Sequence, residues 1–226
     1  MNLTTFKQYL QNKTIALIGP AATLHKSKLG SKIDTYDITC RLNHHLVDSN
    51  KMVKDCGSKN DVVFSGPNLL YCHYEILEKV QPKFICFPRA NISDPNYYRG
   101  MISQIKCDHP EIQCFHVGDE FPSAVEMQMK TSPNTGILAI SYLLSMQVKK
   151  LLIAGFDFYQ NPKIYFDKPG RSSAINRDYE KLIEEHGFIK FSSEHDQESH
   201  MNFFSKLYSE NSSKIELDEF LKNTFS

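Results

Sequence analysis

Short apolar runs recur along this chain of 226 residues at intervals long enough to hold a helix between them. Runs without strict alternation are typical of strands that are covered on both faces, as in a parallel sheet. Strands are expected at Thr14–Ile18, Tyr36–Cys40, Asp61–Ser65, Lys83–Phe87, Ile112–Val117 and Lys150–Ala154. Strands that alternate with helices predict an α/β fold, a Rossmann-like domain with a mostly parallel sheet flanked by helices.

Helices are expected where apolar residues recur every three to four positions. The strongest such segment runs from Thr135 to Met146 and is apolar nearly all round, as a buried helix is. Weaker or amphipathic segments are Asn176–His186, a helix that starts near Asp196 and one that starts at Asp218, the last two separated by a surface connection at Ser209–Ser213.

Composition and charge bear on the number of domains, the partners and the compartment expected for this protein. Hydrophobic residues make up 41% of the chain and no Pro/Gly/Ser-rich linker divides it, so one domain over residues 1–226 is expected. The formal net charge is +0 without a basic stripe, which argues against nucleic acid as a partner. Neither a transmembrane segment nor a signal peptide is recognised, so a cytoplasmic protein is expected. The six cysteines form no CxxC pair and favour buried, reduced thiols over disulfides or zinc.

Two tyrosines follow the last of the predicted strands. Gly155 and Asp157 break the apolar run, and Tyr159 and Tyr165 come after them. Open α/β sheets bind ligands beyond the carboxyl ends of their strands, so two phenol groups are expected at the mouth of the sheet. The alternative is that both tyrosines are ordinary, half-buried aromatic residues.

The first predicted strand runs into Gly19, Pro20 and Ala21, a tight turn expected to open a helix. Free N–H groups at a helix start can receive a phosphate, and Pro20 suits the first helical position. The alternative is a plain turn between a strand and a helix. The absence of a GxGxxG pattern argues against a dinucleotide-dependent oxidoreductase.

Further polar positions also follow predicted strands or begin helices. Asn43 follows Arg41 and Leu42, and the pair Ser65–Gly66 ends another strand. Asn134 precedes Thr135 and Gly136 as a helix cap, which could present backbone donors to a ribose or a base. Without a ligand, Asn43 is a turn residue and Asn134 is a bare cap.

Four of these segments, in this order, resemble the sialyltransferases. Ile33–Asn43 resembles the large sialylmotif of glycosyltransferase family 29, and Asp55–Lys59 is similar to its Val-Gly-Ser-Lys continuation. Ser132–Leu138 resembles the start of the small sialylmotif. Gly155–Asn161, with Tyr165 downstream, is similar to the segment of bacterial family 42 whose two tyrosines hold the departing nucleotide phosphate.

The resemblance implies a GT-A-like sialyltransferase variant. Its activity would be the inverting, metal-independent transfer of sialic acid, or a related nonulosonic or keto-deoxy sugar, from a CMP-activated donor to an oligosaccharide hydroxyl. No cofactor is implied. The sequence has no Asp-x-Asp motif at a predicted strand end to hold a metal, in agreement with a metal-independent reaction. Lipooligosaccharide or capsule biosynthesis at the inner face of the membrane is the implied setting, compatible with peripheral membrane association and with a homo-oligomer.

The resemblance also assigns roles to residues. His195 is the implied base that accepts the proton of the acceptor hydroxyl, Tyr159 and Tyr165 assist the leaving phosphate, and Lys130 faces the acceptor. Nucleotide-sugar-binding positions are Gly19, Pro20, Ala21, Asn43, Ser65, Gly66, Thr135, Gly136, Gly155, Phe156 and Asp157.

The chain departs from the family pattern at three places. Pro20 stands where both families usually have asparagine, and Ser65 or Gly66 stands where family 42 has another. His200 occupies the fifth place after His195, where family 29 has an acid, and is itself an alternative base. These departures motivate a rival interpretation, a catalytically degraded member that binds nucleotide or glycan. A third is a nucleotide-dependent enzyme of another reaction type on the same scaffold.

Overall fold

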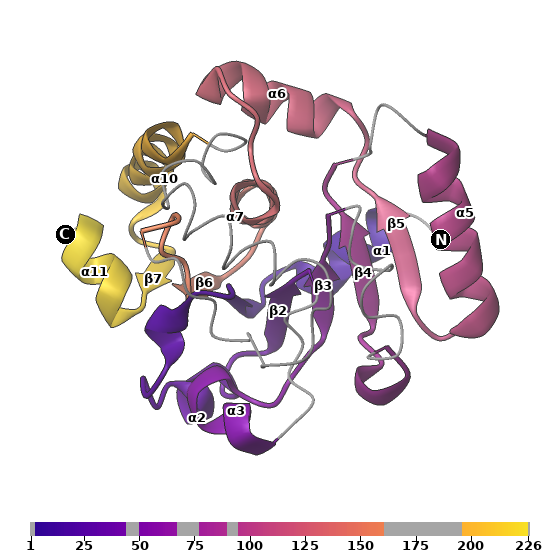
Figure 1. Cartoon of the computed structure of the whole chain (residues 1–226), viewed down its shortest axis with the longest axis horizontal. Helices are drawn as coiled ribbons and strands as arrows, with labels where there is room; N and C mark the ends of the chain where they lie inside the picture. The colour runs from indigo at the N-terminus through magenta and orange to yellow at the C-terminus, as the bar shows by residue number, and fades with distance from the viewer. Residues whose placement is uncertain (1–2, 44–49, 67–76, 90–94, 161–195, 226) are drawn as a thin grey trace, which may run out of the picture.

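A computed structural model describes residues 3–43, 50–66, 77–89, 95–160 and 196–225 of the chain. Its centre is a seven-stranded sheet of order β5-β4-β3-β2-β1-β6-β7, in which every neighbouring pair is parallel (Figure 1). The strands are β1 (Thr14–Ile18), β2 (Ile38–Leu42), β3 (Val62–Phe64), β4 (Phe84–Phe87), β5 (Gln113–His116), β6 (Lys150–Ala154) and β7 (Ile215–Leu217). The helices are α1 (Leu3–Leu10), α2 (Gly30–Ile33), α3 (Asn50–Cys56), α5 (Pro95–Asp108), α6 (Glu120–Met129), α7 (Thr135–Ser145), α10 (Gln197–Asn211), α11 (Glu219–Phe225) and the 3₁₀ helix η1 (Ala22–Leu24).

Successive residues of β1 serve opposite faces of the sheet, as the twofold repeat of a strand requires. Ile15 and Leu17 join the main apolar core with α1, α6, α7 and α10, whereas Ala16 and Ile18 pack with residues of α2 and α3. Figure 1 shows α7 on one side of the sheet and the α2–α3 pair on the other. Both faces are therefore covered, which explains why the strands read as continuous apolar runs.

The strand order reverses direction next to β1. From β1 the chain adds β2 to β5 in sequence on one side, and then returns to place β6 and β7 on the other. Such a switch point leaves a crevice beyond the carboxyl ends of the two central strands. The residues that follow β1 and β6 are thus the first place to look for a site.

The expected α/β fold with a mostly parallel sheet is confirmed, and β1 and β6 have the expected bounds. The expected strand at Tyr36–Cys40 is shifted, since β2 spans Ile38–Leu42. The surface connection expected at Ser209–Ser213 is wrong in its first half, because α10 continues to Asn211. The expected helix Asn176–His186 lies outside the described residues.

Two further features were not expected from the sequence. One is the edge strand β7, which has only three residues and carries Glu216 at its centre. The other is the exposure of Cys107, whereas Cys40, Cys56, Cys86 and Cys114 are free and buried. Burial raises the pKa of the Cys40 and Cys86 thiols well above the ordinary value, so these thiols are protonated and inert.

Candidate active site

Four adjacent strands end in the predicted polar positions. Gly19 follows β1, Asn43 follows β2, Ser65 follows β3 and Gly155 follows β6. Because the strands are parallel and in register, their carboxyl ends lie along one edge of the sheet. The structure therefore brings these positions together at the crevice beside β1 and β6.

Asn43, Gly66 and Thr135 form one polar group at this edge. The Asn43 backbone is left-handed, with φ 52°, a conformation that asparagine tolerates. The Asn43 Oδ1 atom accepts from the Gly66 amide at 2.7 Å, which leaves the side-chain NH₂ as the part that can donate to a ligand. A Cβ atom built on Gly66 would lie 3.2 Å from Thr135 Oγ1. Ser65 is fully buried and its hydroxyl donates to the Gly66 carbonyl, so Gly66 rather than Ser65 borders Thr135.

The turn after β1 differs from the expectation of a phosphate-binding helix start. Only the three-residue 3₁₀ helix Ala22–Leu24 follows, so Pro20 is not at a first helical position. The Gly19 amide donates to the Ala154 carbonyl at 2.8 Å, and the Ala21 amide donates to the Gly155 carbonyl at 2.9 Å. Pro20 has no N–H group. The end of β6 thus engages the amides of Gly19 and Ala21, which are not available to a phosphate.

The segment from Gly155 to Tyr159 is a tight loop. Gly155, Phe158 and Tyr159 have φ angles of 73°, 49° and 63°, and such left-handed backbone is uncommon for bulky residues. Asp157 closes the loop, since its Oδ1 atom accepts from the Tyr159 amide at 3.1 Å. Phe156 is buried, and a Cβ atom built on Gly136 would lie 2.9 Å from its ring. The loop is therefore locked onto the start of α7.

The Tyr159 hydroxyl is held by Asn134, the N-cap of α7. Asn134 Nδ2 donates to Tyr159 Oη at 2.9 Å, while Asn134 Oδ1 accepts from the Ile137 amide at 2.8 Å. The sequence indicated the cap but not its contact with Tyr159. The structure thus adds Asn134 to the candidate site.

His200, in the first turn of α10, contacts the backbone of Asn134. Its Nε2 atom accepts from the Asn134 amide at 3.1 Å, and its Nδ1 atom lies 2.6 Å from the Asp196 carbonyl oxygen. Burial lowers the His200 pKa more than the carbonyl and the charge of Asp196 raise it, so the ring is neutral at neutral pH. Both ring nitrogens have partners inside the protein, so His200 could act as the alternative base only after one of these contacts is broken.

Arg89, two residues after β4, is a second residue that sequence reasoning missed. Its guanidinium donates to Ser132 Oγ at 2.7 Å and pairs with Glu126 Oε2 at 3.1 Å. Ser132 belongs to the turn that leads to Asn134, so a positive charge lies beside the start of α7. An arginine two residues after a predicted strand was the available signal.

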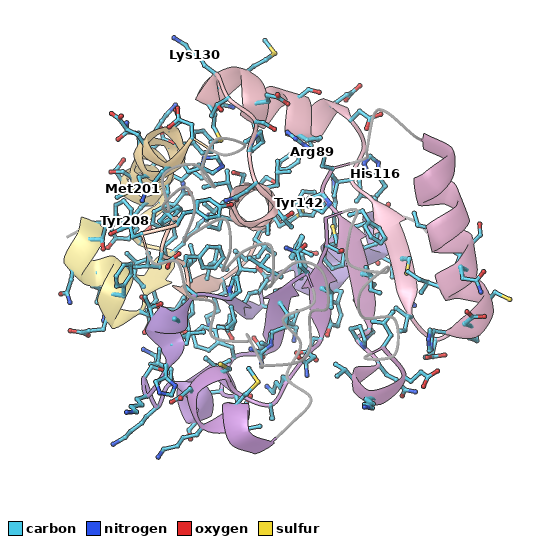
Figure 2. All side chains as sticks on the ribbon, viewed as in Figure 1. Arg89, His116, Lys130, Tyr142, Met201 and Tyr208 are labelled. Carbon is cyan, nitrogen blue, oxygen red and sulfur yellow. The ribbon has the colours of Figure 1, made fainter. Side chains whose placement is uncertain are left out.

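The remaining predicted residues are not in this group. Lys130 caps α6 in a left-handed conformation and projects outward at its end (Figure 2). His195 and Tyr165 lie outside the described residues. Among the described residues, no group of three or more His, Cys, Asp or Glu side chains could hold a metal ion. None of the described helices is long and apolar enough to cross a membrane.

Comparisons with known proteins agree with this architecture. The profile of Glycosyltransferase family 29 (sialyltransferase) matches residues 4–87. A mammalian sialyltransferase, crystallised with Gal-beta-1-3GalNAc-ortho-nitrophenol, is similar in fold at 18% identity, with a TM-score of 0.59 over 93% of this chain and 71% of that one. The sialyltransferase CstII from Campylobacter jejuni, in complex with the substrate analogue CMP-3FNeuAc, is similar at 16% identity, with a TM-score of 0.58 over 92% and 88%.

No curated protein matches the sequence. The family match covers the strands β1 to β4, and the structural matches extend the likeness to the whole sheet. The chain therefore resembles the sialyltransferases of family 29 in its sequence over residues 4–87, and shares its fold with a mammalian and a bacterial sialyltransferase.

Proposed function

We propose that this protein transfers a sialyl residue, or a related nonulosonic or keto-deoxy sugar, from a CMP-activated donor to an oligosaccharide hydroxyl, with inversion and without a metal. The observation that carries the proposal is the Tyr159 hydroxyl, held by Asn134 at the carboxyl edge of the sheet beside Gly155 and Thr135. A phenol fixed at a ligand crevice suits a departing phosphate.

The proposed reaction is a single displacement. The bond between the anomeric carbon and the phosphate oxygen breaks, and its electron pair leaves with CMP. The acceptor hydroxyl forms the new bond from the opposite face, while its proton passes to the proposed base, His195. CMP is a good leaving group because the second ionisation of its phosphate is near pH 6, so hydrogen bonds from Tyr159 and Tyr165 suffice and no bridging metal is needed.

The polar group at the edge of the sheet supports a nucleotide-sugar donor. Asn43 can donate its NH₂ group, and Thr135 Oγ1 lies beside Gly66. The guanidinium of Arg89, whose charge is paired with Glu126, lies next to the α7 start, and a guanidinium is a group that suits the carboxylate of a sialyl residue. CstII, which shares the fold, was crystallised with a CMP-sugar analogue, and this supports the choice of cytidine.

The proposal extends to the acceptor and the cellular setting. An oligosaccharide acceptor, such as lipooligosaccharide or capsule, is the proposed partner, with Lys130 near it. The described cysteines are free, which fits a reducing compartment such as the cytoplasm.

One observation favours a second candidate, a member that binds nucleotide without transfer. The Gly19 and Ala21 amides are bonded to the end of β6 and Pro20 has no amide proton, so these three residues offer a donor phosphate no backbone hydrogen bond. Such a protein would bind CMP but would not release it from a CMP-sugar.

Two measurements test the proposal. In a thermal-shift series, CMP should stabilise the protein more than UMP, GDP or NAD, by about 2.7 kcal/mol at about 100 times Kd. CMP release from CMP-sialic acid should then persist in EDTA. Equal shifts with all nucleotides would refute the donor assignment, a strict need for Mg²⁺ or Mn²⁺ would refute the mechanism, and binding of CMP without turnover would favour the second candidate.

A further inference from the structure

Three elements that are distant in sequence meet at Asn134. The residue caps α7, its amide donates to His200 on α10, and its side chain donates to Tyr159 in the loop after β6. α10 packs along α7 on the same side of the sheet (Figure 1). The backbone amide, the side-chain NH₂ group and the side-chain oxygen of Asn134 each have a hydrogen-bond partner.

The direction of each hydrogen bond follows from the cap. The Ile137 amide can only donate, so the Asn134 atom that it meets is the oxygen and the other is the NH₂ group. This NH₂ group can only donate, so Tyr159 Oη must accept from it. The phenol proton is then directed away from Asn134. Accepting one hydrogen bond also makes the phenol a stronger donor in the next one.

The state of His200 is equally constrained. The Asp196 carbonyl oxygen can only accept, so Nδ1 carries the proton and Nε2 accepts from the Asn134 amide. The ring is fully buried, and water cannot replace either partner. Without an acceptor at Nε2, the Asn134 amide would be unsatisfied and the cap would lose its support from α10.

We infer that His200 is a positioning residue for leaving-group assistance: by accepting from the Asn134 amide, it fixes the Asn134 side chain that orients the Tyr159 hydroxyl toward the departing phosphate. The inference rests on the proposed function, because it assigns the proton of Tyr159 to the phosphate. It gives His200 a role other than that of the base. It also explains how a histidine can serve where the resemblance leads one to expect an acid, since either side chain can accept from this amide.

Four variants test whether His200 acts through Tyr159. His200→Gln retains an acceptor that can reach the Asn134 amide, whereas His200→Met fills similar space without an equivalent acceptor. Tyr159→Phe removes the hydroxyl itself, and the fourth variant combines His200→Met with Tyr159→Phe. His109→Gln is the matched control, because His109 is also buried but lies after α5, toward the opposite edge of the sheet.

The readouts are kcat for CMP release from CMP-sialic acid and the Kd for CMP. Tyr159→Phe should lower kcat by about ten- to a thousandfold, as loss of one such donor does. His200→Met should lower kcat by about tenfold or more through misplacement of the hydroxyl, with Kd changed by less than about threefold. His200→Gln and the control should stay within about threefold of the wild-type kcat.

The double variant gives the decisive comparison. If His200 acts through Tyr159, His200→Met should cost less than about twofold once the hydroxyl is absent. An equal fold-loss in both backgrounds, or a loss in His200→Gln as large as in His200→Met, would overturn the inference while leaving the proposed function intact. Absence of all turnover in the wild type would overturn both. His200→Leu replaces His200→Met in the same cycle if the methionine variant does not fold.

Discussion

The substitution Gly19→Ala tests the contact on which the candidate site is built. Gly19 directly follows β1 and lies against Gly155, which directly follows β6. A Cβ atom on Gly19 would lie 2.3 Å from the Gly155 carbonyl oxygen and 3.0 Å from the Phe156 ring. The nearer atom belongs to the backbone of a central strand end, so it cannot rotate away.

The expected cost follows from this geometry. Contacts between a Cβ and another heavy atom below 3.0 Å essentially do not occur, so the ends of β1 and β6 must separate by roughly 1 Å. Overpacking typically costs 1–3 kcal/mol, and we expect about 3 kcal/mol because the backbone has to move. For a chain of this size that corresponds to a fall in Tm of about 6–12 °C. The same movement shifts the loop that carries Tyr159, and a displacement of about 1 Å can lower turnover by about a hundredfold.

Gly100→Ala is the matched control for this experiment. Gly100 lies within the helix α5, is exposed, and has no atom within 4 Å of a Cβ built on it. Alanine is favoured over glycine in a helix, so this variant should be more stable by about 0.5–1 kcal/mol. Urea unfolding followed by circular dichroism gives both free energies, and CMP release from the donor gives turnover. Equal stability of the two alanine variants would refute the close approach of Gly19 to Gly155.

Three further predictions concern stability. Asp218 accepts from two backbone amides, one of them at Gly155, so Asp218→Asn should lower the free energy of unfolding by about 2–4 kcal/mol; an unchanged urea midpoint would contradict the two bonds. The Tyr142 hydroxyl is buried without a partner in the described part of the chain, so Tyr142→Phe should be neutral or stabilising by up to about 1 kcal/mol, and a clear loss in the same assay would reveal a missing partner. Burial tends to raise the pKa of Glu216, but hydrogen bonds from two lysines and a tyrosine outweigh it and lower this pKa from 4.5 to about 2. The ionised Glu216 therefore stabilises the fold fully above pH 4.5, and this stabilisation is lost as the pH falls to about 2. Over that range the free energy of unfolding of the wild type should fall by about 1 kcal/mol more than that of Glu216→Gln, after allowance for solvent screening. Equal falls for the two proteins would contradict this prediction.

The sheet could be predicted well because its signal is local. A strand covered on both faces needs a continuous apolar run, and such runs mark β1 and β6 to the residue. The edge strand β7 escaped prediction because its three residues, with Glu216 between two apolar neighbours, carry too little pattern. The continuation of α10 to Asn211 was also missed, since polar residues at its end conceal a helix that is held by packing.

The position of the site followed from the sequence by the same logic. Parallel strands end at one edge of a sheet, so polar residues that come directly after them, such as Asn43 and Gly155, must lie near one another. The tyrosine loop after β6 was predicted on this ground; the structure describes its first part, through Tyr159, at this edge, and Tyr165 lies outside the described residues. These conclusions need only the order of the elements and the direction of each strand.

Only the tertiary structure decided which groups within the site bond to one another. Asn134 meets Tyr159 and His200, which are 25 and 66 positions away along the chain. The amides of Gly19 and Ala21 bond to the end of β6, so the turn cannot offer them to a phosphate as the sequence suggested. A hydrogen bond depends on distances of tenths of an ångström between segments that are far apart in sequence, and the periodicity of a sequence carries no information on that scale.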